Sequence, residues 1–247
     1  MKPVRIFGLE LRITPTKQWF WSEVDAGTAM RIATVNPEFI LNALVDTEAT
    51  KALEKMTHCV IDGTGMMIAC NVLHVIRPDI PWVERIPGAD IVEQFCTKNY
   101  SKPTTILFAG DESAPIAAKK LQEQAGEGVT IESLVLGKID ETLPRLSKEE
   151  IAVITQLNPT ILCLGLGNPK QERIIAEQLA ELPIQIMIGV GGTFQFYHDR
   201  PRAPHALRTL GLEWLYRGAT VEGHAKRSKR AFFDFVWLAI KETFRPR

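Results

Sequence analysis

The sequence is short of the features that would place it in a functional class at first reading. No uncharged apolar run reaches the roughly 18 residues that a membrane-spanning helix needs, and nothing after Met1 resembles a secretory signal. Cysteine is scarce, and no two cysteines form a C-x-x-C pair. We therefore expect buried free thiols in a reducing cytoplasm, in preference to disulfides or structural zinc. The cysteines are Cys59, Cys70, Cys96 and Cys163.

Several nucleotide and metal motifs are missing as well. No G-x-x-x-x-G-K-[ST] run is present, which excludes a P-loop. Gly165-x-Gly167 lacks the third glycine of the dinucleotide fingerprint, which disfavours binding of NAD. No Asp-x-Asp pair is available to hold a divalent metal against a nucleotide diphosphate. We therefore expect neither a metal nor another cofactor.

An excess of charge of one sign is also lacking, because 29 Lys and Arg balance 29 Asp and Glu. This balance argues against a uniformly basic nucleic-acid binder. It is uneven along the chain, however: residues 1–199 hold 18 basic and 25 acidic side chains, and residues 200–247 hold 11 and 4. The first part carries a net charge of −7 and the second +7. We expect a globular domain over residues 1–200 and a basic, aromatic appendage over residues 201–247.

What the sequence does contain is an alternation of short apolar runs and helical patterns. The runs are continuously apolar, which is typical of parallel strands buried on both faces. Their alternation with helices predicts a doubly wound, mostly parallel α/β sheet. The expected strands are residues 31–35, 59–61, 104–109, 129–134, 160–164 and 184–188. The expected helices are residues 37–46, 88–99, 114–124, 147–157 and 169–181.

Glycines and polar residues follow these strands, at the edge where open α/β sheets bind ligands. Glycine lets a ligand approach the backbone, and helix N-termini offer N–H groups to a pyrophosphate. The pattern indicates a crevice for a nucleotide or a nucleotide-sugar. The residues of this kind are Gly110, Gly165, Gly167, Gly191 and Gly192, with Lys170 in the segment that opens the next helix.

Asp62 is the best candidate for a general base. It follows a buried strand and stands beside Gly63 and Gly65, where a bulky acceptor could approach. A carboxylate at a strand end is rigidly placed, as base catalysis requires. Arg85 is a candidate anion contact, because a guanidinium pairs bidentately with phosphate.

Structural explanations compete with each of these assignments. Asn36 and Pro37 fit a helix N-cap followed by proline at the first helical position. Asn168-Pro169-Lys170-Gln171 fits the same arrangement, with Gln171 completing a capping box. Asp62-Gly63 fits a turn, and Arg85 fits a surface ion pair with Glu84 or Asp90.

An ordered set of motifs resembles a known family, the WecG/TagA/CpsF glycosyltransferases, also called glycosyltransferase family 26. The resemblance covers about residues 31–230. The motifs are Thr34-x-Asn36-x-Glu38, Asp62-Gly63-x-Gly65, Glu84-Arg85-x-x-Gly88-x-Asp90, Gly167-x-Pro169-Lys170-Gln171-Glu172, Gly189-Val190-Gly191-Gly192-x-Phe194, Arg202-Ala203-Pro204 and Gly211-Leu212-Glu213-Trp214-Leu215-Tyr216-Arg217.

The resemblance implies a Rossmann-like fold and an inverting, metal-independent enzyme. Such an enzyme moves a sugar from a UDP-sugar to a polyprenyl-diphosphate-linked saccharide at the cytoplasmic face of the membrane. It serves the synthesis of cell-surface polysaccharide, exopolysaccharide included. No residue selects the sugar among N-acetylmannosamine, its uronic acid, glucose and glucuronic acid.

The resemblance also implies roles for individual residues. Asp62 corresponds to the catalytic base. The resemblance implies that residues 1–200 form a catalytic domain that binds the nucleotide-sugar. Residues 201–247 are then expected to form a pocket lid that also touches the membrane. The residues expected around donor or acceptor are Thr34, Asn36, Arg85 and Gln171. Those expected in the appendage, near the diphosphate, are Arg202, Arg217, Arg227 and Arg230.

The C-terminal segment combines a basic run with an amphipathic pattern. Lys226-Arg227-Ser228-Lys229-Arg230 precedes an aromatic stretch whose apolar residues share one helical face. We expect a helix that lies in an anionic membrane surface, which would make the protein cytoplasmic and peripheral. The alternative is a terminal helix packed on its own core or on a sister subunit in a homo-oligomer. The residues of the face are Phe232, Phe235, Val236, Ala239 and Ile240, with Phe233, Trp237 and Phe244 alongside.

Two other functions stay open at this point. One is an NAD(P)-dependent oxidoreductase on a similar sheet, against which the missing third glycine counts. The other is a non-catalytic UDP-sugar-binding protein, which would bind a UDP-sugar without turnover whether or not Asp62 is replaced. The interpretation that the motifs favour is a hexosyltransferase whose partners are a UDP-sugar, a lipid-linked acceptor and the membrane, with no nucleic acid.

Overall fold

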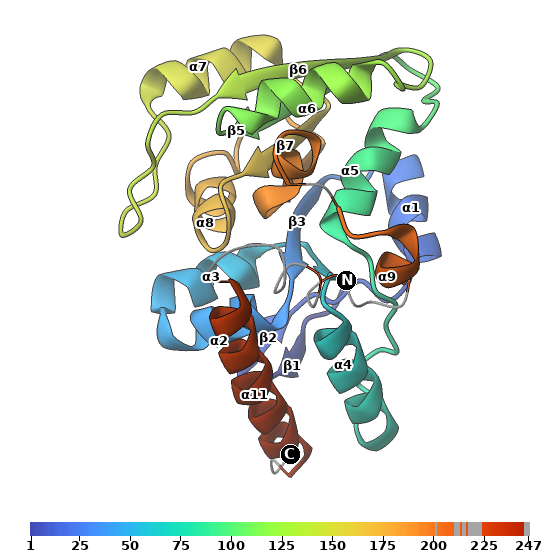
Figure 1. The fold of residues 1–247 in the computed structure, drawn as a ribbon, viewed down its shortest axis with the longest axis vertical. Helices are drawn as coiled ribbons and strands as arrows, with labels where there is room; N and C mark the ends of the chain where they lie inside the picture. The colour runs from blue at the N-terminus through green and yellow to red at the C-terminus, as the bar shows by residue number, and fades with distance from the viewer. Residues whose placement is uncertain (201, 210–212, 214–215, 217–223, 245–247) are drawn as a thin grey trace.

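The protein folds around a six-stranded parallel sheet in the order β4-β3-β8-β7-β5-β6 (Figure 1). The computed structural model describes residues 1–200, 202–209, 213, 216 and 224–244, and of these the side chains of 205, 209 and 224–232 are left out. The strands are β3 (Met30–Val35), β4 (His58–Ile61), β5 (Thr104–Gly110), β6 (Val129–Val135), β7 (Ile161–Gly165) and β8 (Ile186–Gly189). The predicted doubly wound, Rossmann-like α/β fold is therefore confirmed.

Helices cover both faces of this sheet (Figure 1). Consecutive strand residues alternate between two hydrophobic clusters, as Ile32 and Ala33 of β3 do, which explains the continuous apolar runs. One cluster includes residues of α2 (Pro37–Val45), α3 (Thr47–Lys55), α4 (Thr64–Ile76), α7 (Lys148–Leu157) and α8 (Lys170–Glu177). The other includes residues of α1 (Lys17–Asp25), α5 (Gly88–Thr97), α6 (Ser113–Gln122) and the 3-10 helix η1 (Gly191–Tyr197).

Local capping explains where several predicted elements begin. The Asn36 side chain accepts a hydrogen bond from the backbone N–H of Phe39 at 2.9 Å, and Pro37 occupies the first turn of α2. Ser147 and Glu150 form the predicted capping box of α7. Helix α8 ends earlier than predicted, at Glu177. All four cysteines are buried and free, as predicted.

The residues that precede β3 form two short strands and the helix α1. Strands β1 (Val4–Ile6) and β2 (Leu9–Leu11) form a separate antiparallel pair, with Phe7 and Gly8 between them at positive φ. Their inward side chains join the hydrophobic core. The N-terminal segment is therefore a hairpin and a helix that cover the body.

The C-terminal helix α11 (His224–Thr243) lies beside α2 and α4 (Figure 1). Phe235 is only 2% exposed, and its ring centroid lies 5.2 Å from that of Phe7. Glu242 is buried and accepts a hydrogen bond from Arg77 at 2.9 Å. One face of the described part of α11 is therefore packed on the body. The division of the chain at residue 200 stays a prediction, and so does a homo-oligomer.

No helix in the described part of the chain combines the length and the hydrophobicity that crossing a bilayer requires.

Candidate active site

A pocket of about 440 Å³ opens where four strands of the sheet end. Its wall is built from the residues after β3, β4, β7 and β8, from η1, and from the segment that follows η1. This is the carboxyl edge of the sheet, as the sequence predicted. The described residues that line it are Thr34, Asn36, Glu38, Asp62, Pro87, Ala89, Gly167, Asn168, Gln171, Val190, Gly191, Gly192, Thr193, Gln195, Phe196, Asp199, Arg200, Ala203, Glu213 and Tyr216.

The structure brings seven of the predicted site residues together in this wall. They are Thr34, Asn36, Asp62, Gly167, Gln171, Gly191 and Gly192. Arg85, Gly110, Gly165, Lys170 and Arg202 are not among the lining residues that the structure describes. Arg217 lies outside the described residues, and the side chains of Arg227 and Arg230 do as well. Every substrate role given to these residues stays a prediction.

Asp62 stands at the end of β4, directly beside the start of α2. Its backbone N–H donates to the carbonyl of Val35 at 2.9 Å, which continues the pairing of β3 with β4 by one residue. A Cβ on Gly63 would lie only 2.8 Å from Cδ of Pro37, so the two loops approach as closely as glycine allows. The close approach places Asp62 and the N-cap Asn36 in the same wall.

Thr34 is the last-but-one residue of β3, and its hydroxyl donates to the carbonyl of Gly189 at 2.9 Å. A Cβ on Gly88 would lie 2.9 Å from Cγ2 of Thr34, so α5 begins directly against this side chain. The hydroxyl is thereby held at the junction of β3, β8 and α5. The base of the pocket is fixed by backbone packing on three sides.

Gln171 does not form the capping box that its position in the sequence predicts, and that interpretation is wrong. Helix α8 begins at Lys170, after a cis Asn168–Pro169 peptide, with no side-chain cap. The side-chain oxygen of Gln171 instead accepts from the backbone N–H of Gly191 at 3.0 Å. Gln171 therefore connects α8 to the loop that follows β8.

Two of the predicted anion contacts have protein partners. Nη2 of Arg85 donates to the carbonyl of Arg208 at 2.5 Å, which differs from the ion pair with Glu84 or Asp90 that we considered. Arg202 makes the contact with Asp90, at 2.6 Å, and a second one with Glu93 at 3.4 Å. These bonds attach the segment that follows η1 to the body of the protein.

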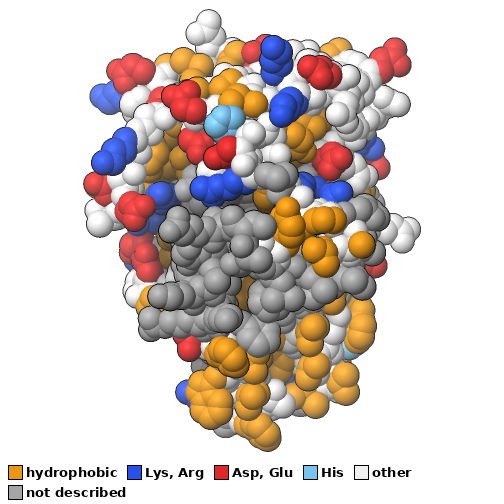
Figure 2. Space-filling model, viewed as in Figure 1, with side chains coloured by type: hydrophobic (Ala, Val, Ile, Leu, Met, Phe, Trp, Pro, Cys, Tyr) orange, Lys and Arg blue, Asp and Glu red, His pale blue; other side chains and the backbone are white. Residues whose placement is uncertain are grey.

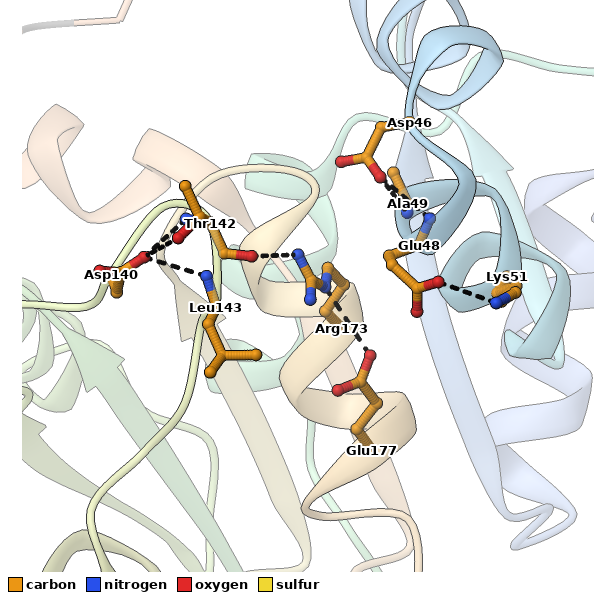
Figure 3. Close-up of polar contacts among 9 residues, drawn as sticks. All are labelled: Asp46, Glu48, Ala49, Lys51, Asp140, Thr142, Leu143, Arg173 and Glu177. Atoms are coloured by element: carbon orange, nitrogen blue, oxygen red, sulfur yellow. Dashed lines mark hydrogen bonds and ion pairs between the residues drawn. The ribbon is translucent and has the colours of Figure 1, made fainter.

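Lys170 and Arg173 of α8 both bind the loop that follows β6. Nη1 of Arg173 donates to the carbonyl of Thr142 at 3.0 Å, and Lys170 pairs with Glu141 at 3.4 Å. Figure 3 shows Arg173 between this loop and Glu177 of the same helix, with the capped start of α3 nearby. The start of α8 is therefore secured on the side away from β8.

The pocket wall is rich in carboxylates. Among its described residues are Asp62 and three further acids, whereas the single cation is Arg200. No three His, Cys, Asp or Glu side chains lie together as metal ligands in the described ranges, and independence of metal stays a prediction. A diphosphate bound here would need positive charge beyond the described wall. The further acids are Glu38, Asp199 and Glu213.

Sequence reasoning missed a part of the wall that comes from η1 and the segment after it. Glu38 was visible inside the motif Thr34-x-Asn36-x-Glu38, where it received no role. Gln195 and Arg200 follow the last strand by several residues, so the rule of strand ends did not reach them. The missed signal was the polar run after η1.

Comparison with known proteins agrees with this geometry. The model of the glycosyl transferase WecG/TagA/CpsF family matches residues 4–247. The chain is 29% identical over 192 residues to an N-acetylglucosaminyldiphosphoundecaprenol N-acetyl-beta-D-mannosaminyltransferase of Staphylococcus aureus (strain MRSA252). The match covers 75% of this chain and 70% of that relative, and the protein of the same name from strain NCTC 8325 / PS 47 matches equally.

Proposed function

This chain belongs to the glycosyl transferase WecG/TagA/CpsF family, and we propose that it moves N-acetylmannosamine from a UDP-sugar to a saccharide linked to polyprenyl diphosphate. As a member of that family it is a hexosyltransferase. The single observation that carries the proposal is the placement of Asp62, Asn36, Thr34 and Gln171 in one pocket at the carboxyl edge of the sheet. In this account the product extends a cell-surface polysaccharide.

The names of the relatives support the choice of acceptor and sugar. Both Staphylococcus aureus proteins are named for N-acetylglucosaminyldiphosphoundecaprenol as acceptor and for N-acetyl-beta-D-mannosamine as the sugar transferred. The acids of the pocket wall favour a neutral sugar for an independent, electrostatic reason. A uronic acid would bring another carboxylate towards Glu38, Asp62 and Asp199, and like charges at short range repel.

We assign the base role to Asp62. Its carboxylate takes the proton of the acceptor hydroxyl while that oxygen attacks the anomeric carbon from the face opposite UDP. The bond between the anomeric carbon and the diphosphate oxygen breaks, and its electron pair leaves with UDP. The configuration inverts in this single displacement. Because Asp62 directly follows β4 and its backbone N–H is bonded to Val35, its backbone is held in place, which is the property that general-base catalysis needs.

The negative charge on the leaving diphosphate must be balanced by cations and hydrogen-bond donors, because the acids of the wall cannot do so. Arg200 is the cation of the described wall, and the backbone N–H groups around Gly167 are further donors, whereas the N–H of Gly191 already donates to Gln171. We assign the remaining positive charge to arginines of the basic appendage, which carries 10 Lys and Arg in residues 201–247. The division of charge along the chain then has a function, since an acidic pocket receives its cations from the tail.

An exposed apolar surface supports contact with the membrane. Figure 2 shows hydrophobic side chains gathered at the end of the molecule where Figure 1 places α4 and α11. Phe244 is 81% exposed, Val75 is 74% exposed and Trp237 is 59% exposed, whereas most apolar side chains of this size are buried in folded proteins. The exposed residues are Ile68, Val72, Val75 and Ile76 of α4, with Phe233, Val236, Trp237, Ile240 and Phe244 at and beyond α11.

The occupant of this surface in our account is an anionic bilayer. The basic run Lys226–Arg230 lies in the same helix as the exposed aromatic residues, and basic residues beside Trp and Phe are typical of helices that lie in the membrane interface. The helix therefore has two roles: its buried face holds it on the body, and its exposed face meets lipid.

An assay of transfer tests the proposal. The protein is incubated in EDTA with UDP-N-acetylmannosamine, UDP-N-acetylglucosamine or UDP-N-acetylmannosaminuronic acid, and with a short-chain lipid-diphosphate N-acetylglucosamine acceptor. We expect release of UDP and a disaccharide product with the first donor. Binding of UDP-sugar without turnover would favour a binding protein, and binding of NAD(P) would favour an oxidoreductase. Either outcome would overturn the proposal.

A further inference from the structure

We propose that Glu172 is a positioning residue of the transfer reaction, because its carboxyl group orients the side-chain amide of Gln171 at the base of the pocket. The inference rests on the proposed function, since Gln171 is given its role by the pocket of the transferase. It adds a residue that touches no substrate, since Glu172 is not in the described pocket wall. The action of Glu172 passes entirely through its neighbour.

A chain of two hydrogen bonds connects Glu172 to the loop after β8. Oε1 of Glu172 accepts from Nε2 of Gln171 at 2.9 Å. Oε1 of Gln171 in turn accepts from the backbone N–H of Gly191 at 3.0 Å. Glu172 is fully buried and Gln171 is 1% exposed, so water does not compete for the bond between them, whereas the bond to Gly191 is only partly buried. Gly191 itself lines the pocket.

This chain of two hydrogen bonds selects one of the two orientations of the Gln171 side-chain amide. In the observed orientation, each end of the amide meets a complementary partner. If the amide were rotated by half a turn, its oxygen would face the Glu172 oxygen and its NH₂ group would face the Gly191 N–H. Both contacts would then be unfavourable, because a buried polar group without a partner is costly. Glu172 thus decides which group Gln171 turns towards the pocket.

The pair is also held sterically, against the last residue of β8. A Cβ on Gly189 would collide with Nε2 of Gln171 and with Oε1 of Glu172, so both side chains lie directly on the β8 backbone. The carbonyl of the same Gly189 accepts the hydroxyl of Thr34. Glu172, Gln171 and Thr34 therefore meet at one backbone position.

Burial of this carboxyl group is costly. Oε2 of Glu172 is buried and has no hydrogen-bond partner among the described residues. Desolvation raises the pKa of Glu172 to about 7. An apolar residue of similar size would avoid this cost, but it could not accept the Gln171 N–H. The hydrogen bond to Gln171 is what the carboxyl group adds to the fold.

A double-mutant cycle tests the proposal by kinetics. Glu172→Leu, Gln171→Ala and the double variant are compared with the wild type in kcat/KM for the UDP-sugar and for the acceptor. We expect Glu172→Leu to lower kcat/KM by about tenfold or more in the wild-type background and by less than about twofold in the Gln171→Ala background. Glu172→Gln keeps an acceptor oxygen and should stay within about threefold of the wild type. Equal losses in both backgrounds would overturn the proposal.

A second measurement stays informative if Glu172→Leu does not fold or if no substrate is turned over. The side-chain amide protons of Gln171 are identified in a ¹H–¹⁵N spectrum by their absence from Gln171→Glu. We expect them to exchange slowly with solvent in the wild type and in Glu172→Gln. Fast exchange in the wild type would overturn the proposal. Absence of turnover with slow exchange would overturn the proposed function and leave the hydrogen-bond chain intact.

Discussion

The hydroxyl of Thr34 donates to the carbonyl oxygen of Gly189 at 2.9 Å, across the boundary between the neighbouring strands β3 and β8. The two residues are 155 positions apart in the chain. Each stands at or next to the end of its strand, and the loops that follow both strands enter the pocket wall. This bond therefore fixes the spacing between the side of the pocket that carries Asp62 and the side that carries Gln171.

Replacing Thr34 by valine keeps the shape of the side chain and removes the hydroxyl. We expect Thr34→Val to lower the free energy of unfolding by about 1–2 kcal/mol, because the buried carbonyl of Gly189 loses a donor. Thr105→Val on β5 is the matched control and should change stability by less than about 0.5 kcal/mol. Chemical denaturation gives both values. A Thr34→Val protein as stable as the control would show that the bond contributes nothing.

Gly165 is required for a steric reason. A Cβ there would lie 2.6 Å from the ring of Phe194, which stacks on Phe108 at 4.7 Å. We expect Gly165→Ala to lower the free energy of unfolding by about 1–3 kcal/mol, since the ring must move in a packed core. Gly137→Ala is the control, because its Cβ would meet Glu150 at an ordinary 3.6 Å. Similar denaturation curves for the two variants would contradict this account.

The raised pKa of Glu172 predicts a dependence of stability on pH. The pKa is about 7 in the fold, against an ordinary value of 4.5 for a glutamate side chain. The folded state therefore binds the proton more tightly, so this contribution to stability is complete below pH 4.5 and is lost as the pH rises towards 7. Glu172→Gln does not titrate. Its stability relative to the wild type should increase by about 2 kcal/mol between pH 5 and pH 8.5, and a constant difference would refute the prediction.

The apolar surface of α4 and α11 predicts binding to anionic vesicles. We expect Trp237→Ser with Phe244→Ser to weaken sedimentation with phosphatidylglycerol vesicles by about tenfold or more, because two large exposed side chains lose their contact with lipid. Val72→Ser with Val75→Ser should weaken it as well if α4 belongs to the same surface. Leu143→Ser, at a residue that is 53% exposed in the loop after β6, is the control.

The competing explanation for this surface is a second copy of the chain. Light scattering of the wild type without vesicles separates the two. A stable dimer that the α4 or α11 substitutions dissociate, together with unchanged vesicle binding, would assign the surface to self-association.

The sequence was sufficient for the sheet and for the edge at which ligands bind, for a physical reason. Strands buried on both faces leave continuous apolar runs, and all six predicted strands lie in the sheet. Glycines and Asp62 at strand ends could be located from those runs alone. Helices α3 and α4 were not predicted. Thr47–Lys55 is largely polar and buries only Ala49, Ala52 and Leu53, whereas Thr64–Ile76 is apolar on most sides and shows no clear helical stripe.

Side-chain partners could not be predicted in the same way. Gln171 fitted a capping box by spacing, but its partner Gly191 lies twenty residues further along the chain. Arg202 fitted a phosphate contact, whereas the structure places Asp90 and Glu93 of α5 beside it. For Gln171 a tertiary contact replaces a local one, and for neither residue does the spacing within its motif hold information about the protein partner.

The central claim is that Asp62 acts as the base in sugar transfer, and the most direct test is the turnover of Asp62→Asn. This variant keeps the shape of the side chain and removes its ability to take a proton. With UDP-N-acetylmannosamine and the lipid-diphosphate acceptor both saturating, we expect kcat to fall about 100- to 10,000-fold. The affinity for UDP and the thermal midpoint should stay as in the wild type. Glu132→Gln, at an exposed position of β6, is the control and should keep full activity. A folded Asp62→Asn protein that releases UDP at the wild-type rate would contradict the account.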